Sequence, residues 1–261
     1  STDNFGYGYG MPLFEFYGPL PFYFGSFFYW LGLDIVLVLK IMFIAVNLGT
    51  LIGSYLLGKK LVSKSGGVLL AGAFTLAPYR AVNLFVRGAL SEAWGMMALP
   101  WILLGIIKVI NREKGGFWQL VISLLVLFLS HNLSVVIFAP FAFVFALVYL
   151  FIKTWKNNKK KKIDWHLFKN RLLALFGSGL VALGLSAFYL VPAFFEKDLT
   201  KVADTVLSDY FNYRLHFLYL RQFFRPNWGY RGSEWGPNDG FSFFLGYIQL
   251  LGLGLGSLVL I

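Results

Sequence analysis

The sequence predicts an all-α protein, a polytopic bundle of transmembrane helices. Of its 261 residues, 58% are hydrophobic and 13% are charged, which is about half the charged share of a soluble domain. The apolar residues also gather in runs long enough to cross a bilayer as helices, which needs about 20 residues. There is no cysteine, which excludes a disulfide framework and a thiol nucleophile. We expect a single transmembrane domain over residues 1–261.

The first 33 residues contain no Lys or Arg and are predicted to form an outer loop. Residues 6–21 combine Gly, Pro and aromatic rings, and Glu15 is the one charged residue among them. Residues 19–31 are apolar but too short to span. Trp and Tyr favour the membrane–water interface, so we expect a helix lying in the membrane surface with Pro19 and Pro21 in its first turn.

Seven spans are predicted beyond this loop. Residues 117–152 form an apolar run too long for one helix, and Ser130-His131-Asn132 divides it. The run that Pro78 ends is short, so we expect a short or broken span there. The predicted spans are residues 34–58, 67–78, 94–110, 117–130, 132–152, 172–192 and a last one starting at 241, with a polar outer loop over 193–240. The chain has no initial Met and stops inside an apolar run, so we expect it to be part of a longer protein.

The distribution of basic residues predicts which loops face the cytoplasm. Loops 59–66, 108–116 and 153–171 hold 14 Lys or Arg and 2 acids, whereas the loops of the other set hold 8 Lys or Arg and 9 acids. Cytoplasmic loops carry the excess of Lys and Arg. We therefore expect an integral protein of a prokaryotic plasma membrane, with residues 1–33, 79–93, 130–132 and 193–240 outside.

The net charge of +11 does not indicate a nucleic-acid partner. Nucleic-acid binding requires Lys and Arg along one soluble face. Here the Lys and Arg fall between long apolar runs instead. The lipid bilayer is the expected partner, and the oligomeric state is left open.

Two arginines on the outer side are candidates for binding an anion. Arg80 and Arg87 are seven residues apart, which places them on one face of a helix, and guanidinium groups match phosphate oxygens. The alternative is that they anchor at lipid head groups or pair with Glu92 or Glu196. Because Arg87 and Glu92 are five residues apart, a poor helical spacing, we do not predict a bridge between them.

His131 has two interpretations. It lies at the junction of two apolar runs, where an ionisable residue usually faces a cavity or a partner. Alternatively, His131 and Asn132 only form a polar turn between helices. The three histidines lack any metal-ligand spacing, so no metal site is predicted, and a divalent metal or other cofactor stays open.

Five motifs carry a resemblance to a known family. Together they resemble the multi-spanning membrane family labelled 6-pyruvoyl-tetrahydropterin synthase-related, which is similar in layout to the GT-C membrane glycosyltransferases. The label says nothing reliable about pterin chemistry. The motifs are residues 8–21, Ala77-Pro78-Tyr79-Arg80, residues 86–92, Leu129-Ser130-His131-Asn132 and residues 188–196.

The resemblance implies a GT-C-like fold and a transferase of the cell envelope. Such enzymes move a sugar from a polyprenyl-phosphate carrier to an acceptor on the outer face, and an acid of the first outer loop usually serves as base. Asp3 is the candidate base, unless the true base precedes Ser1. The residues that the resemblance places around the substrate are Arg80 and Arg87 as a phosphate clamp, Glu92, His131 and Asn132 along the pocket, Glu15 and Glu196 beside it, and Tyr7, Tyr9 and Tyr17 on the sugar or acceptor side.

Two other classes of function use the same residues. A transporter or flippase of a lipid-linked or anionic substrate would bind it without bond chemistry, and inverted repeats would favour this class. A non-catalytic membrane scaffold would bind a partner through residues 193–240. Sugar and acceptor identity cannot be read from the sequence.

Overall fold

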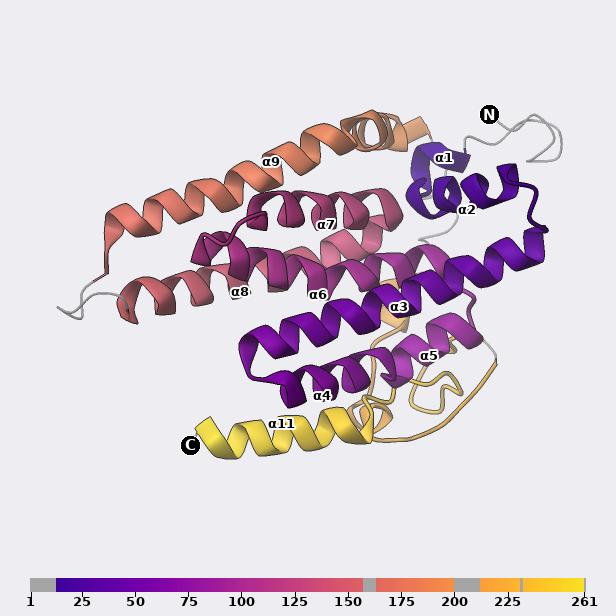
Figure 1. Ribbon diagram of the computed structural model, residues 1–261. Helices are drawn as coiled ribbons and strands as arrows, with labels where there is room; N and C mark the ends of the chain where they lie inside the picture. Colours follow the sequence, from indigo (N-terminus) through magenta and orange to yellow (C-terminus); the bar gives the residue numbers. More distant parts are fainter. Residues whose placement is uncertain (1–12, 157–162, 200–211, 231, 261) are drawn as a thin grey trace.

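The computed structural model describes residues 13–156, 163–199, 212–230 and 232–260 (Figure 1). Within these ranges the regular structure is helical and contains no strand, which confirms the predicted all-α class. The helices are α1 (Leu13–Phe16), α2 (Leu20–Trp30), α3 (Ile35–Leu61), α4 (Lys64–Thr75), α5 (Pro78–Phe85), α6 (Leu90–Asn111), α7 (Gly116–Ser130), α8 (Asn132–Lys156), α9 (Trp165–Glu196) and α11 (Tyr247–Leu260), with 3₁₀ turns at Lys197–Leu199, Tyr213–Leu215 and Leu220–Phe223.

Four helices of the described chain are long and apolar enough to cross a membrane, namely α3, α6, α8 and α9. A fifth candidate is the pair α4 and α5, which is bent by 46° at the break before Pro78, because proline cannot continue a helix across its own position. The predicted number of seven is therefore too high for the described residues. One reason is α7, which is apolar but only 15 residues long.

Several helix ends differ from the predicted spans because polar residues continue the helices beyond their apolar parts. α6 begins at Leu90, four residues before the predicted start, and α9 begins at Trp165, where the Asp164 carboxylate accepts the N–H of Leu167 at 2.9 Å. Such a side-chain cap satisfies a backbone donor at the helix start. In contrast, α11 begins at Tyr247, later than the predicted start at 241. The break at Ser130-His131-Asn132 is confirmed, since α7 ends at Ser130 and α8 starts at Asn132.

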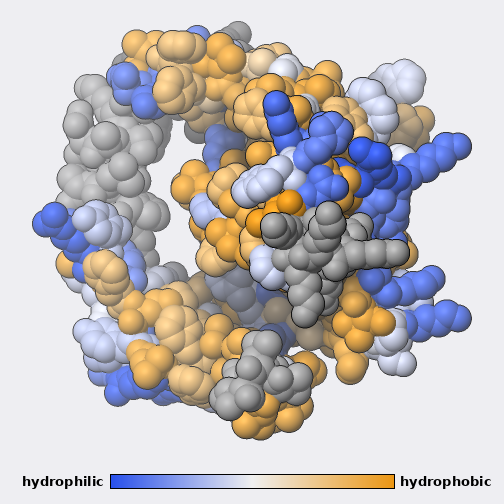
Figure 2. Space-filling view, turned by 90° about the vertical axis from the view of Figure 1, so that its left-hand side faces the viewer, coloured by the Kyte–Doolittle hydropathy of each residue, from blue (hydrophilic) through white to orange (hydrophobic). Residues whose placement is uncertain are grey.

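The helices bring the two predicted sets of loops to opposite ends of the bundle (Figure 1). One end, here called the basic end, holds the α3–α4, α6–α7 and α8–α9 connections. The other, here called the pocket end, holds α1, α2, α5, the α7–α8 junction and the end of α9. Figure 2 looks onto the basic end and shows hydrophilic side chains gathered there. Among the described residues of these connections, the exposed basic side chains are Lys59, Lys60, Lys64, Arg112, Lys114 and Lys169.

Contacts at the basic end tie the helices together. Lys60, in the last turn of α3, pairs with Glu113 at 2.6 Å. Burial opposes ionisation of Glu113, but the Lys60 and Asn111 hydrogen bonds outweigh it and hold the pKa of this carboxyl below its usual value. Arg171 of α9 donates to the carbonyls of Val109 and Ile110, which satisfies acceptors at the C-terminal end of α6.

Helix α6 is the centre of the bundle. It packs most extensively against α3, α7, α8 and α9. In the most apolar 18-residue stretch of α6, 72% of the residues are buried, against 22% in that of α3. Gly105 allows the closest approach: a Cβ at this position would lie 2.9 Å from the Cα of Leu120 in α7. A Cβ within 3.0 Å of a backbone atom would force the backbone to move. The short distance between α6 and α7 therefore depends on glycine having no side chain at position 105.

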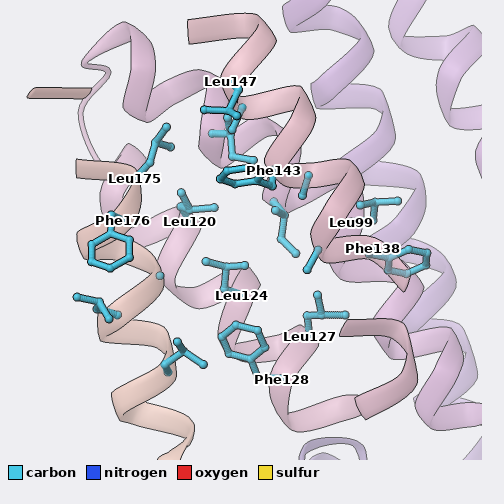
Figure 3. Close-up of a pocket in the computed structure, with 18 of the residues that line it drawn as sticks. Leu99, Leu120, Leu124, Leu127, Phe128, Phe138, Phe143, Leu147, Leu175 and Phe176 are labelled. Carbon is cyan, nitrogen blue, oxygen red and sulfur yellow. The ribbon is translucent and has the colours of Figure 1, made fainter. Parts of the chain in front are cut away.

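An apolar cavity of about 440 Å³ lies among α6, α7, α8 and α9. Figure 3 shows that leucine and phenylalanine side chains of these helices surround it. Every lining residue is aliphatic, aromatic or glycine, so the cavity offers no hydrogen-bonding side chain and suits a hydrocarbon.

Replacement of Gly105 tests the packing of α6 on α7. We expect Gly105→Ala to lower the free energy of unfolding by about 1–3 kcal/mol, because the added methyl overpacks the contact with Leu120. Gly184→Ala in α9 is the matched control, since a Cβ there meets nothing within 4 Å, and alanine should stabilise that helix by up to about 1 kcal/mol. Unfolding of both variants in detergent micelles measures the difference. Equal stability of the two would contradict the close contact.

Candidate functional site

A tight turn between α5 and α6 brings Arg87 beside Glu92. Pro78 occupies the first turn of α5, where its missing N–H costs nothing. The chain then leaves α5 and reverses at Gly88, whose φ of +59° suits glycine. Glu92 returns in the first turn of α6, and its carboxylate lies 2.7 Å from Nη1 of Arg87. The bridge that helical spacing did not predict exists because a turn, and not a continuous helix, joins the two residues.

Glu92 is the acceptor for three side chains. Its Oε1 accepts the Tyr79 hydroxyl at 2.7 Å and the Asn83 amide at 2.9 Å, and its Oε2 accepts Arg87. Arg87 also donates to the side-chain oxygen of Asn83 at 2.5 Å. Since Asn83 is fully buried, this network satisfies polar groups that would be costly to leave unpaired. We call these four residues the Glu92 network.

Part of the Arg87 guanidinium stays available. All of its hydrogen bonds within the described residues use Nη1, so Nη2 and Nε have no partner there. The side chain is 40% exposed and lines a pocket of about 530 Å³, here called the Arg87 pocket. Its walls come from α5 and from the segment before α11, and they are Tyr79, Val86, Arg87, Tyr230, Gly232, Ser233, Phe241 and Phe243.

Arg80 does not join Arg87 in a clamp. Its side chain is 1% exposed and reaches into the bundle, where Nη1 donates to Thr50 at 2.9 Å and Nη2 donates to Asn47 at 3.1 Å. Its Nε has no partner among the described residues. The predicted pair of Arg80 and Arg87 around one phosphate is therefore corrected: both are on or next to α5, but the Arg80 guanidinium is buried against α3 and only Arg87 lines the Arg87 pocket.

His131 separates α7 from α8 and caps the second helix. Its backbone is extended, with φ −156° and ψ 110°, and its Nδ1 accepts the backbone N–H of Ser134 at 3.2 Å. Since Nδ1 accepts, the proton of the neutral ring lies on Nε2. Burial lowers the pKa of His131, which favours this neutral form. Both interpretations of the sequence thus have a basis: Nδ1 shapes the turn, and the ring also lines a cavity.

That cavity, here called the His131 pocket, has a volume of about 190 Å³ and lies at the pocket end. Asn132, the residue after His131, also lines it. The Asn132 side chain is held in place, because its oxygen accepts the Tyr189 hydroxyl at 3.0 Å and its amide donates to the Phe16 carbonyl at 3.4 Å. Gly18 lies directly on the end of α7, where a Cβ would be 2.1 Å from the Ser130 carbonyl. The lining residues are Phe16, Tyr17, Gly18, Ser91, Ser130, His131, Asn132 and Leu133.

Glu15 and Glu196 lie together and line neither of these pockets. α1 contacts α9, and a side-chain hydrogen bond with Glu196 raises the pKa of Glu15, with burial adding to the shift. Two carboxyl groups can bond only if they share a proton, which explains the direction of this shift. Their role in substrate binding stays a prediction.

Three predicted site residues lie outside the described part of the chain, and one described residue near the site was not predicted. Asp3, Tyr7 and Tyr9 lie in the part that the structure does not describe. The sequence analysis did not single out Asp239, which is 5% exposed and accepts the Ser233 hydroxyl at 2.7 Å. A run of turn residues from 236 to 240 was the available signal. Among the described residues no group of three His, Asp or Glu side chains could hold a metal ion.

Comparison with known proteins shows similarity to a protein of uncharacterized function. No protein-family model matches the chain, and no solved structure matches it. The chain is similar to an uncharacterized protein of Lactococcus lactis subsp. cremoris (strain MG1363), with 30% identity over 199 residues that cover 74% of the chain. The match covers 30% of that relative, so the matched part of the chain spans less than a third of its length.

The Glu92 network should contribute more to stability than the surface ion pair at the basic end. We expect Glu92→Ala to lower the free energy of unfolding by about 1–3 kcal/mol, because it leaves the buried Asn83 amide with only the weak Met96 thioether as acceptor, at 3.4 Å. Glu113→Ala removes the pair with Lys60, whose side chains are 37% and 31% exposed, and should cost less than about 1 kcal/mol. Denaturant titration compares the two variants, and a larger loss for Glu113→Ala would refute this ranking.

The Glu15–Glu196 contact should weaken as pH rises. A carboxyl whose pKa is raised in the folded state stabilises that state below its unfolded value of 4.5, and the contribution is lost as pH rises through the raised pKa. We expect amide exchange in residues 13–17, corrected for intrinsic rates, to be faster at pH 7 than at pH 4. In Glu15→Gln this change should disappear. If the variant keeps the full pH dependence, another group is responsible.

Proposed function

We propose that the protein is a polyprenyl-phosphate-dependent glycosyltransferase of GT-C type, which acts at the pocket end of the bundle. The observation that carries the proposal is Arg87. Its guanidinium is neutralised by Glu92 on one edge, while Nη2 and Nε stay available at a pocket of about 530 Å³. An anchored guanidinium with unused donors suits a phosphate group.

The rest of the Arg87 pocket supports a sugar phosphate as ligand. Tyr79, Tyr230, Phe241 and Phe243 bring aromatic rings to its walls, and such rings can pack on the C–H faces of a sugar. Tyr79 also binds Glu92, so its ring position is fixed by the same network that holds Arg87. This arrangement would orient the ligand before reaction.

The apolar cavity supports a lipid carrier. It lies among three candidate spans, α6, α8 and α9, and the shorter apolar helix α7, and the described residues that line it have no polar side chain. A polyprenyl chain that enters from the bilayer would meet an equally apolar lining there, so its binding would rest on close packing and not on transfer from water. A carrier bound in this way would have its phosphate at the end of the apolar bundle, where Arg87 lies.

The proposed orientation of the protein in the membrane follows from the charge of the basic end. The exposed lysines and arginines of the three connections would face the cytoplasm, which would place the Arg87 pocket outside. Reaction on the outer side agrees with the expectation for GT-C enzymes.

Transport is the second candidate, and the bent α4–α5 pair favours it. Discontinuous helices form substrate sites in many transporters, and here the break carries Arg80, which is buried without a carboxylate partner among the described residues. A flippase of a lipid-linked anion would use the same helices and leave the sugar–phosphate bond intact.

Replacement of Arg87 tests the transferase. Full-length protein in lipid nanodiscs is given a polyprenyl phosphate carrying a radiolabelled sugar, and release of carrier phosphate and labelled product is followed. We expect Arg87→Met to reduce turnover about 10- to 100-fold, which corresponds to the loss of one charge-assisted hydrogen bond of about 1.5–3 kcal/mol. Arg225→Met is the matched control, because Arg225 is exposed and lines no pocket described above, and it should retain full turnover.

The same variants separate the two candidates. If no donor is turned over by the wild type, while Arg87→Met abolishes uptake of a lipid-linked anion into vesicles, the transferase proposal fails and transport stands. Equal turnover in Arg87→Met and wild type would also remove the assigned role of Arg87.

A further inference from the structure

The His131 pocket contains hydrogen-bonding groups without charge. Ser91 is 3% exposed and Ser130 is 0% exposed, and neither hydroxyl has a partner among the described residues. The Nε2–H of His131 likewise has none there, since the hydrogen bonds of its ring are made by Nδ1. The three residues line one small cavity. Both serine hydroxyl oxygens have almost no accessible surface, so each would reach an occupant by rotation of its side chain.

These groups predict that something polar occupies the pocket. A buried hydroxyl without a hydrogen bond costs about 1–3 kcal/mol, and two such hydroxyls are unusual in one place. The volume of about 190 Å³ corresponds to roughly six water molecules at about 30 Å³ each. This is the size of one small ring and too small for a large ligand.

The lining selects the chemistry of that occupant. Among the described residues, no Lys, Arg, Asp or Glu lines the pocket, so a phosphate or a cation would find no counter-charge there. Phe16, Tyr17 and Leu133 provide apolar surface beside the donors. A sugar ring matches both features, because its hydroxyls accept and donate hydrogen bonds at the rim while its C–H faces are apolar.

The two pockets are close neighbours. Ser91 of the His131 pocket precedes Glu92, the residue that holds Arg87. His131 is also near enough to Glu92 and Arg87 for both charges to affect its pKa, which Glu92 raises and Arg87 lowers. One substrate can therefore bind both sites at once, with an anionic part in the Arg87 pocket and an uncharged part in the His131 pocket.

We infer that the His131 pocket is a binding subsite for an uncharged sugar ring, whose hydroxyls bond to Ser91, Ser130 and Nε2 of His131. The inference rests on the proposed function and deepens it. The Arg87 pocket takes the phosphate, and the His131 pocket recognises hydroxyl configuration and thereby sets sugar specificity.

Binding of uncharged glycosides tests this subsite without any reaction. Full-length protein in nanodiscs is titrated with the methyl α-D-glycosides of glucose, galactose and mannose, and saturation-transfer NMR follows each probe. We expect the wild type to bind one probe more tightly than its epimers. The Ser91→Ala/Ser130→Ala variant should bind it at least about 10-fold more weakly, because each lost hydrogen bond is worth about 0.5–1.5 kcal/mol.

A matched control and a second probe keep the test specific. Ser54→Ala removes another fully buried, unpartnered hydroxyl, which lies on α3 and outside the pocket, and it should bind the glycoside like the wild type. Inorganic phosphate should bind equally to wild type and to the double variant, which also shows that the variant is folded, and should bind about 10-fold or more weakly to Arg87→Met.

The outcomes separate this inference from the transferase. Unchanged glycoside binding in the double variant, no glycoside binding by the wild type, or equal binding of all three epimers would overturn the sugar subsite, even if donor turnover persists; water would then fill the pocket. Epimer-selective binding that depends on Ser91 and Ser130, in a protein that turns over no donor, would support the subsite and refute the transferase.

Discussion

The burial of α6 is the constraint on which the rest of the structure depends. This helix contacts six others, α2, α3, α5, α7, α8 and α9, and its close approach to α7 requires Gly105. Because α6 is fixed along its length, its two ends become fixed platforms. One end receives Arg171 at its carbonyl groups. The other places Ser91 at the His131 pocket and holds Arg87 through Glu92. The geometry of the candidate site is thus set by packing far from it.

Polar groups at the pocket end are satisfied mainly by one another. Glu92 accepts Tyr79, Asn83 and Arg87, and Tyr189, Asn132 and the Phe16 carbonyl form a second set. Interiors with low dielectric make such networks rigid when complete and costly when incomplete. The groups that remain unsatisfied or available, on Arg87, Ser91 and Ser130, therefore stand out as places for a ligand.

Much of the architecture could be predicted from the sequence, because long apolar runs and the positions of Lys and Arg report directly on helices and their ends. The break at His131 was predicted from three polar residues in an apolar run. The Arg87–Glu92 bridge was not, since it depends on the backbone angle of Gly88 and not on helical spacing. Arg80 and Arg87 were assigned to one face by periodicity alone, which cannot show that Asn47 and Thr50 draw one of them into the bundle. The role of Asp239 was also hidden, because it depends on the fold of an irregular loop.

The turn at Gly88 has a consequence for recognising similar sites in other chains. Its positive φ converts a five-residue spacing that no helix could use into a direct ion pair. The segment Arg87-Gly88-Ala89-Leu90-Ser91-Glu92 is therefore a geometric signature. A chain with arginine just before a left-handed glycine, and glutamate in the first turn of the following helix, can build the same anchored guanidinium whatever the sequence of its spans.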